Sequence, residues 1–167
     1  MDIILHLICV EVLLAIGLAV MSLTDLALDL SKDVPRSPRE TFAGYVHAGR
    51  MLDKCRAVAA GTNHDYHYNC PLDRFFFDFT GIDHEEFQDF VATGADDKAV
   101  ADWITENSRV KNREDVVKWN NKMRDMRISE MPLPLQMFLE DYIPQYIPAG
   151  KVVRVWFDIY DIEEGRM

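Results

Sequence analysis

Residues that start helices and residues that stop them alternate at short intervals through the middle of the chain. Asp83, Asp96 and Asn112 are typical helix N-caps, and Gly81 and Gly94 are typical helix stops. Between them apolar residues recur every three or four positions, which gives each segment one apolar face. The sequence therefore predicts an all-α fold, a compact irregular domain of several short helices. The residues expected on the buried faces are Phe87, Phe90, Val91, Val100, Trp103, Ile104, Val116, Trp119 and Met123.

Length and composition are those of an ordinary globular protein. The chain has 167 residues, of which 49% are hydrophobic, and we expect one helical domain at residues 21–167. Its 28 acidic residues outnumber its 18 basic ones, so the formal net charge is −10 and no nucleic-acid partner is expected. Residues 109–127 are the exception, with seven Lys or Arg against three Asp or Glu. They indicate either a solvated helix face or a patch for an acidic partner.

The cysteines predict a reducing environment. Cys9, Cys55 and Cys70 include no close pair and no Cys-x-x-Cys motif. A disulfide framework and a structural zinc site are therefore not expected, and we predict a cytoplasmic location.

Residues 1–20 form an apolar N-terminal extension, expected to be helical and about as long as a membrane-spanning helix. Glu11 lies in its middle and would cost on the order of 2.5–3.5 kcal/mol on insertion into a bilayer. Asp2 stands where an export signal carries positive charge. We therefore expect the natural chain to start at Met21. The alternative is a genuine anchor or signal, in which case the protein is membrane-anchored or exported and the membrane is a partner.

A long helix is predicted over residues 38–60. Ser37 is its N-cap, the proline that follows suits the first turn, and Glu40 can hydrogen-bond back to the cap. Gly49 lies on the inner face and would let a neighbouring element approach closely. Gly61 stops the helix.

Three other segments are predicted to be helical. Residues 22–31 place leucines on one stripe. Pro71 begins a helix whose four phenylalanines indicate a position deep in the core. Prolines interrupt the chain after Met131 and leave room for a short helix from Leu135 to about Tyr142.

The C-terminal segment alternates like a β-strand. Apolar side chains stand at Val153, Val155, Phe157 and Ile159. A strand needs a partner, and no other segment of the sequence offers a clear one. We therefore predict an extended or irregular segment from Lys151, with a helix after Phe157 as the alternative.

The stretch at residues 63–73 concentrates reactive side chains between the long helix and the aromatic helix. Cys70 precedes Pro71 at a helix start, where the helix dipole favours a thiolate. His67 is spaced to take the thiol proton, and Asp73 follows one turn later. The candidate catalytic residues are therefore Cys70, His67 and Asp73. The alternative is structural, with a buried cysteine and a carboxylate that caps the helix.

A metal site is another interpretation of this stretch. His64, His67 and Cys70 are three residues apart, and imidazole and thiolate are good ligands for zinc or copper. Asparagines and a proline disfavour a continuous helix here, and no fourth ligand is evident. We therefore expect neither a metal nor another cofactor.

Basic residues near the long helix suggest an anion site. Arg39 lies at its predicted start and Lys54 lies within it, and such positions suit phosphate or carboxylate. The alternative is a set of salt bridges to the chain's own acids. Tyr66 and Tyr68, in a loop held between two helices, complete the candidate ligand-binding residues.

Three stretches of the sequence carry a resemblance to a known family, and they read RSPRETFAGYVHAGRMLDKCRAVAAGT, DYHYNCPLDRFFFDFTGID and WFDIYDIEEGR. Over about residues 24–164 the chain resembles a bacterial family of uncharacterised proteins, the domain-of-unknown-function family numbered 5069. His64 departs from the family, which has glycine there. The resemblance implies a small, mainly helical fold, a start near Met21 and no established activity.

Together these features favour a small acidic module that binds a small molecule, an anion among the candidates, or a protein partner. An enzyme that uses Cys70 and His67 is the alternative, and a metal-binding protein that uses His64, His67 and Cys70 is the second alternative. The sequence has no Walker, dinucleotide-binding or His-Glu-x-x-His motif that would identify an enzyme class. Whether the protein is an enzyme therefore stays open.

Overall fold

The computed structural model describes residues 22–167. The expectations for residues 1–20 and for a start at Met21 lie outside these residues. Within 22–167, no helix is both long enough and apolar enough to cross a membrane.

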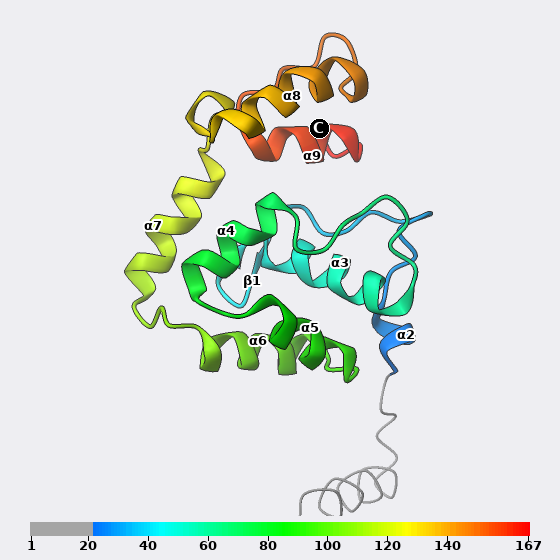
Figure 1. Cartoon of the computed structure of the whole chain (residues 1–167), viewed down its shortest axis with the longest axis vertical. Helices are drawn as coiled ribbons and strands as arrows, with labels where there is room; N and C mark the ends of the chain where they lie inside the picture. Colours follow the sequence, from blue (N-terminus) through cyan, green and yellow to red (C-terminus); the bar gives the residue numbers. More distant parts are fainter. Residues whose placement is uncertain (1–21) are drawn as a thin grey trace, which may run out of the picture.

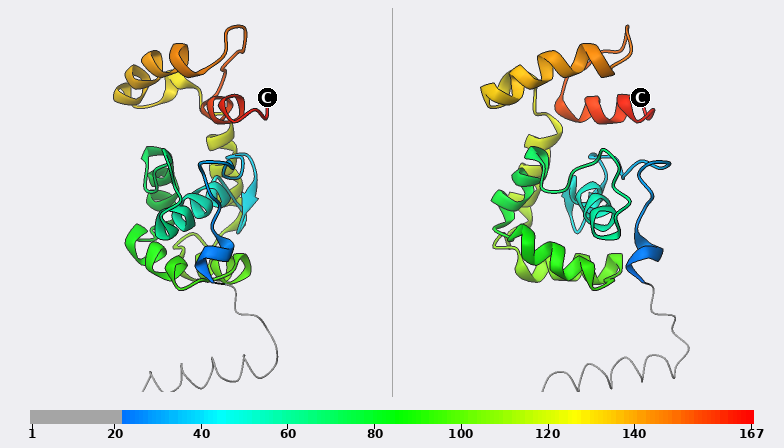
Figure 2. Two further views of the ribbon diagram at one scale, coloured as in Figure 1. Left: turned by 90° about the vertical axis from the view of Figure 1, so that its right-hand side faces the viewer. Right: turned by 45° about the vertical axis from the view of Figure 1, so that its right-hand side comes forward.

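Helices dominate the described part of the chain, which confirms the predicted fold class (Figure 1). Helix α3 runs through the middle of the lower body, and α7 leads from that body to α8 and α9, which lie side by side (Figure 2). The elements are α2 (Leu23–Leu26), β1 (Thr41–Phe42), β2 (Tyr45–Val46), α3 (Ala48–Ala60), α4 (Pro71–Thr80), α5 (His84–Ala92), α6 (Asp97–Asn107), α7 (Arg113–Arg124), the 3-10 turn η1 (Ile128–Glu130), α8 (Leu133–Tyr146) and α9 (Trp156–Glu163).

Aromatic side chains form the centre of the core. The Phe76 ring meets Tyr45 edge to face at 5.3 Å between centroids, and the Phe77 and Phe87 rings lie 5.9 Å apart. Each ring pair adds roughly 0.5–1.5 kcal/mol beyond the area that it buries. Helix α4 supplies two of these rings and is therefore as central as its phenylalanines predict.

The predicted N-caps of α5, α6 and α7 are confirmed. Asp83 accepts hydrogen bonds from two backbone N–H groups of α5, Asp96 accepts one from Ala99, and Asn112 accepts one from Glu114. These short-range bonds satisfy N–H groups that have no partner inside the helix.

The helix predicted over residues 38–60 is wrong for its first ten residues. Ser37 and Glu40 do hydrogen-bond to each other, but they close a turn, and a β-hairpin follows before α3 begins at Ala48. The hairpin turn has positive φ at Ala43 and Gly44, which a helix cannot accommodate. Asn120 of α7 holds the turn, because its amide donates to the Gly44 carbonyl and accepts from Val46 N–H.

Two glycines of this region act as predicted. Gly49 lets the Arg36 side chain lie against α3, since a Cβ there would be only 3.1 Å from Arg36 Nε. Gly61, with φ of +72°, ends α3.

The bounds of two predicted helices need correction. The first helix covers only Leu23–Leu26 of the predicted 22–31. Helix α8 is longer than predicted and contains Pro144, which lies on an exposed turn.

The C-terminal segment without regular structure is shorter than predicted. Helix α9 begins at Trp156, because the carboxylate of Asp158 accepts from the N–H groups of Arg154 and Val155 and so caps its first turn. Phe157 and Ile159 are then buried on the helix, so the alternating apolar pattern marks a buried helix and not a strand.

Candidate functional site

A buried ion pair joins α3 to α4. Lys54 Nζ donates to both carboxylate oxygens of Asp73, at 2.8 and 2.9 Å, and His47 Nε2 lies 2.7 Å from Asp73 Oδ1. The Asp73 and His47 side chains have no exposed surface, and that of Lys54 is 4% exposed. Charges removed from water in this way need a partner, and here each has one.

Lys54 also ties to this pair the loop at residues 61–70, which joins α3 to α4 and which we call the cysteine loop. Its Nζ donates to the His67 carbonyl at 3.0 Å and lies 3.2 Å from Cys70 Sγ. The Cys70 N–H donates to Asp73 Oδ2 at 3.2 Å, so Asp73 caps α4 as the structural alternative proposed. The structure thus brings together three of the candidate residues: Lys54, Cys70 and Asp73.

Burial and pairing set the protonation states of these groups. Burial lowers the pKa of His47 to about 4, against the opposing pull of Asp73, so the imidazole is neutral at pH 7 and Nε2–H donates. Burial by itself would raise the pKa of Asp73, but Lys54 and His47 outweigh it and hold that pKa well below its usual range. Burial raises the pKa of the Cys55 thiol to about 12.

The predicted Arg39 and a further basic residue, Arg50 of α3, are neutralised by α9 and the residues after it. Arg39 forms ion pairs with both Asp158 and Asp161. Arg50 holds Glu164 in a two-point pair at 2.6 and 2.8 Å, and the Tyr66 hydroxyl donates to the same carboxylate at 3.0 Å. The structure therefore places the chain's own carboxylates where the anion hypothesis put a ligand.

The remaining candidates lie apart. The Tyr68 hydroxyl donates to the His84 carbonyl at 2.8 Å, and its ring stacks on Phe87. The His67 ring is exposed, and no hydrogen bond joins it to Cys70 among the described residues. His64 lies beside Asp65 at the surface. Within residues 22–167, no three His, Cys, Asp or Glu side chains are placed to hold a metal ion.

A hollow of about 390 Å³ lies beside the cysteine loop. Its lining is mostly polar, and Asn69, which has φ of +56°, contributes a buried Oδ1 without a hydrogen-bond partner in the described chain. The lining residues are Val58, Asn63, His67, Tyr68, Asn69, His84, Glu85 and Gln88.

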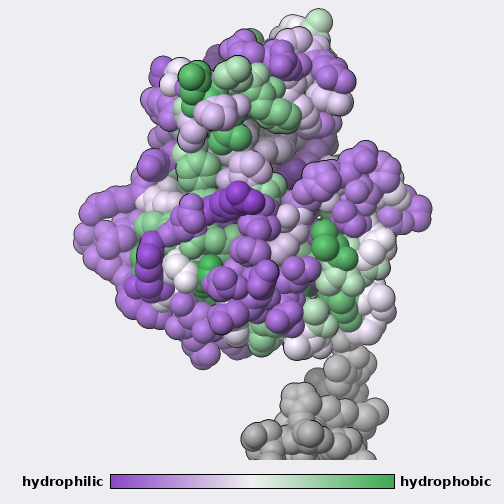
Figure 3. Space-filling model, viewed as in Figure 1, coloured by the Kyte–Doolittle hydropathy of each residue, from purple (hydrophilic) through white to green (hydrophobic). Residues whose placement is uncertain are grey.

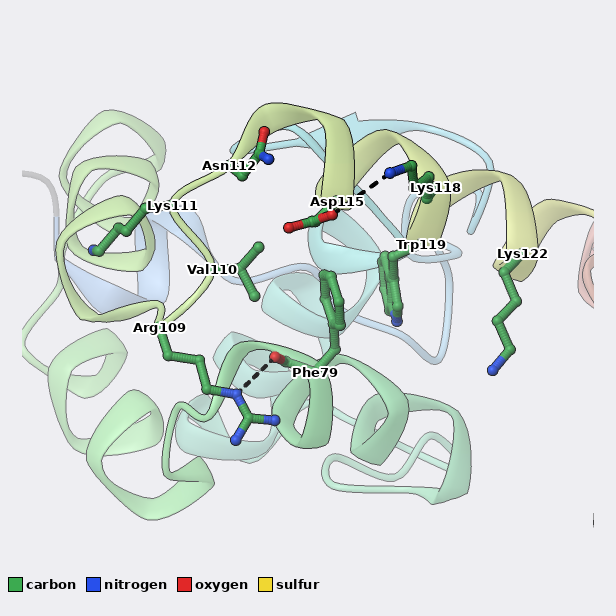
Figure 4. A pocket seen from close by; sticks show the side chains of 9 residues that line it. All are labelled: Phe79, Arg109, Val110, Lys111, Asn112, Asp115, Lys118, Trp119 and Lys122. Carbon is green, nitrogen blue, oxygen red and sulfur yellow. Dashed lines mark hydrogen bonds and ion pairs between the residues drawn. The ribbon is translucent and has the colours of Figure 1, made fainter.

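A larger groove of about 600 Å³ lies between α4, α7 and the loop that joins α6 to α7 (Figure 4). Its floor is a stacked pair, Phe79 and Trp119, with ring centroids 5.1 Å apart and planes 7° from parallel. Four basic residues line the groove, which we call the basic groove, and Figure 4 shows that the Lys111 side chain points away from the floor. Its lining residues are Phe79, Arg109, Val110, Lys111, Asn112, Asp115, Lys118, Trp119 and Lys122.

Carbonyl groups position two of the four basic side chains. Arg109 Nε donates to the Phe79 carbonyl at 3.1 Å, as Figure 4 shows. Lys111 Nζ donates to the last carbonyls of α6, at Thr105 and Glu106, both at 2.9 Å. Such bonds fix the side chains, and the negative end of the α6 dipole offsets part of the Lys111 charge without the full charge of a carboxylate.

The lysines of α7 are nearly free of carboxylates. Lys118 is 73% exposed and lies 3.9 Å from Asp115, the one acid of the lining. Lys122 has no hydrogen bond or ion pair to the described residues. Within residues 22–167, the basic stretch seen in the sequence therefore becomes a surface on which one carboxylate, that of Asp115, accompanies four basic side chains. Phe79 was missed because it lies far from that stretch in the sequence and meets Trp119 only in the folded molecule.

Comparison with known families matches residues 32–166 to one described as Domain of unknown function (DUF5069). The chain belongs to this DUF5069 family. The match spans both the cysteine loop and the basic groove, so both are parts of the DUF5069 domain. No curated protein matches the chain. The family description gives no activity, and any function must be argued from the site itself.

Proposed function

We propose that this DUF5069 domain is a binding module, and that the basic groove binds an acidic segment of a partner protein. The observation that carries the proposal is a groove with an apolar floor whose lining has four basic residues and one acid, on a chain of net charge −10. Positive charge that the chain's own acids do not neutralise is expected to attract a negatively charged partner.

The floor of the groove supports a partner that carries an apolar side chain. Phe79 is half-buried and stacks on Trp119, which is only 8% exposed, so the open apolar surface of the floor is mainly Phe79 with Val110 beside it. Aromatic anchors at the centre and charges at the rim are the usual arrangement of protein interfaces. A bare inorganic anion would leave this floor uncovered.

The cysteine loop supports binding less well. Lys54, Arg39 and Arg50 are each held by carboxylates of the chain, so an external anion would have to displace a buried or half-buried partner. An enzyme using Cys70 and His67, and a metal protein using His64, His67 and Cys70, stay predictions.

Fluorescence anisotropy with a labelled peptide tests the proposal. The peptide is rich in glutamate and aspartate and carries one phenylalanine, and its control has glutamine and asparagine in place of the acids. We expect the acidic peptide alone to bind, and its affinity to fall as salt is raised from 50 to 300 mM. The Lys118→Glu/Lys122→Glu variant should bind it at least about tenfold more weakly.

Lys32→Glu/Lys98→Glu is the matched control, because it changes the net charge equally at two exposed lysines that do not line the groove. It should bind the peptide as the unmodified chain does. Equal loss in both variants, or equal binding of both peptides, would contradict the proposal. Tighter binding of a single-stranded oligonucleotide than of the peptide would replace the acidic partner with a nucleic acid.

A further inference from the structure

Helix α8 carries apolar side chains that nothing in the described chain covers. Leu133, Met137 and Phe138 are 65%, 63% and 57% exposed, and we call them the α8 ridge. Hydrophobic residues gather over α8 in the space-filling view (Figure 3). Large apolar side chains clustered in this way mark an interaction surface more often than a free one.

We infer that the acidic segment bound by the basic groove is α8 of a second copy of this chain. This inference rests on the proposed function and names its partner. Two exposed acids, Glu140 and Asp141, follow the ridge on the same helix. The ridge and these acids thus combine the two properties that the groove selects, an apolar anchor and negative charge.

The two surfaces are complementary in kind. The half-buried Phe79 ring, which backs onto the nearly buried Trp119, matches Phe138 and Met137, and the lysines at the rim of the groove match the two acids. Opposite charges at the edge of an interface steer association and fix its register, while the apolar centre supplies most of the affinity.

One molecule cannot make this contact with itself. Asn112 and the rest of the joining loop lie at the start of α7, whereas α8 lies beyond the other end of that helix (Figure 1). The groove of one copy must therefore take the ridge of another, which makes the contact heterologous. Such contacts close into a ring or extend head to tail, so assembly grows with concentration.

Two variants of the full chain test the inference by analytical ultracentrifugation at concentrations from 1 to 200 μM. Lys118→Glu/Lys122→Glu removes the groove's charge, and Met137→Ser/Phe138→Ser removes the ridge. All four side chains lie at the surface, so both variants should fold. We expect the unmodified chain to form dimers and larger species, and each variant alone to stay monomeric.

An equimolar mixture of the two variants is the decisive sample. Each supplies the surface that the other lacks, so the mixture should contain a one-to-one dimer and nothing larger. A monomeric mixture, or an unmodified chain that stays monomeric at 200 μM, would overturn the inference. Self-association of the ridge variant alone would also overturn it, because another surface would then be responsible.

The peptide measurement separates this failure from failure of the proposed function. If the acidic peptide binds the groove but the chain does not associate with itself, the groove serves a different acidic protein and only the second copy is wrong. If neither occurs, both are wrong. The Lys32→Glu/Lys98→Glu control should associate as the unmodified chain does.

Discussion

Lys54 and Asp73 form a two-point ion pair between α3 and α4 that excludes solvent almost completely. Asp73 is also the cap of α4 and the partner of His47, so one carboxylate serves three groups. The pair fixes the cysteine loop against α3, since Lys54 reaches that loop at the same time. The ion pair therefore acts first as a structural link between α3, α4 and the cysteine loop.

Removing one partner should destabilise the fold more than removing both. Lys54→Met leaves a buried carboxylate and Asp73→Asn leaves a buried ammonium, and each should lower the free energy of unfolding by about 3–5 kcal/mol. The double variant leaves neither charge and should lose no more than either single variant. Urea unfolding at pH 7 measures all three. Strictly additive losses would contradict this account, and the exposed pair Lys98→Met/Asp102→Asn should change stability little.

His47 should make stability depend on pH between 6.5 and 4. Its folded pKa is lowered to about 4, so between these values the unfolded chain takes up a proton that the folded chain does not. Stability conferred by the neutral imidazole is thus present above pH 6.5 and falls on acidification by on the order of 3 kcal/mol, levelling near pH 4. Asp73, whose folded pKa is also lowered, acts in a separate window below about pH 3.9.

The variant His47→Asn isolates this effect, because asparagine tolerates the positive φ of that position. Its unfolding free energy should vary less between pH 6.5 and 4 than that of the unmodified chain. His67→Asn alters an exposed histidine and should leave the pH profile unchanged. Parallel profiles for His47→Asn and the unmodified chain would show that another group carries the dependence.

Local signals were the predictable part of this fold. The N-caps at Asp83, Asp96 and Asn112 act within their own helices, so nearby residues suffice to find them. The hairpin before α3 was not predictable in this way, because Asn120, distant in the sequence, satisfies its turn. The cap-like pattern at Ser37 predicted a hydrogen bond with Glu40, which forms. It does not mark a helix start, because the bond closes a turn.

The candidate site likewise has a part that local sequence signals predict and a part that depends on contacts between distant residues. Spacing grouped Cys70 and Asp73 with His67, and it assigned Lys54 to a separate anion site. In the structure Lys54 meets Cys70 and Asp73, and the exposed His67 ring does not join them. That Asp73 would neutralise Lys54 depends on how two helices pack, which spacing does not fix. The stack of Phe79 on Trp119 likewise requires α4 and α7 to lie together.

The two described cysteines should differ sharply in reactivity. Cys55 is fully buried with a pKa raised to about 12, whereas Cys70 is partly exposed. Iodoacetamide at pH 8, followed by peptide mapping, should label Cys70 at least about a hundredfold faster, because the thiolate is the reacting form. In 8 M urea the two rates should converge. Equal rates in the folded protein would contradict the burial of Cys55, and rapid labelling of Cys70 well below pH 8 would favour the enzyme alternative.

The substitutions Gly81→Ala and Gly61→Ala should lower the free energy of unfolding by similar amounts, but only Gly81→Ala should weaken binding of the acidic peptide. Both have φ near +70°, so an alanine at either should lower the free energy of unfolding by about 1–2 kcal/mol. A Cβ at Gly81 would lie 2.9 Å from Arg109 Cδ, whereas one at Gly61 meets nothing within 4 Å. Since Arg109 borders the basic groove, Gly81→Ala should displace it and weaken binding of the acidic peptide severalfold. Gly61→Ala should bind the peptide as the unmodified chain does. Equal affinities in the two variants would show that Arg109 takes no part in binding the peptide.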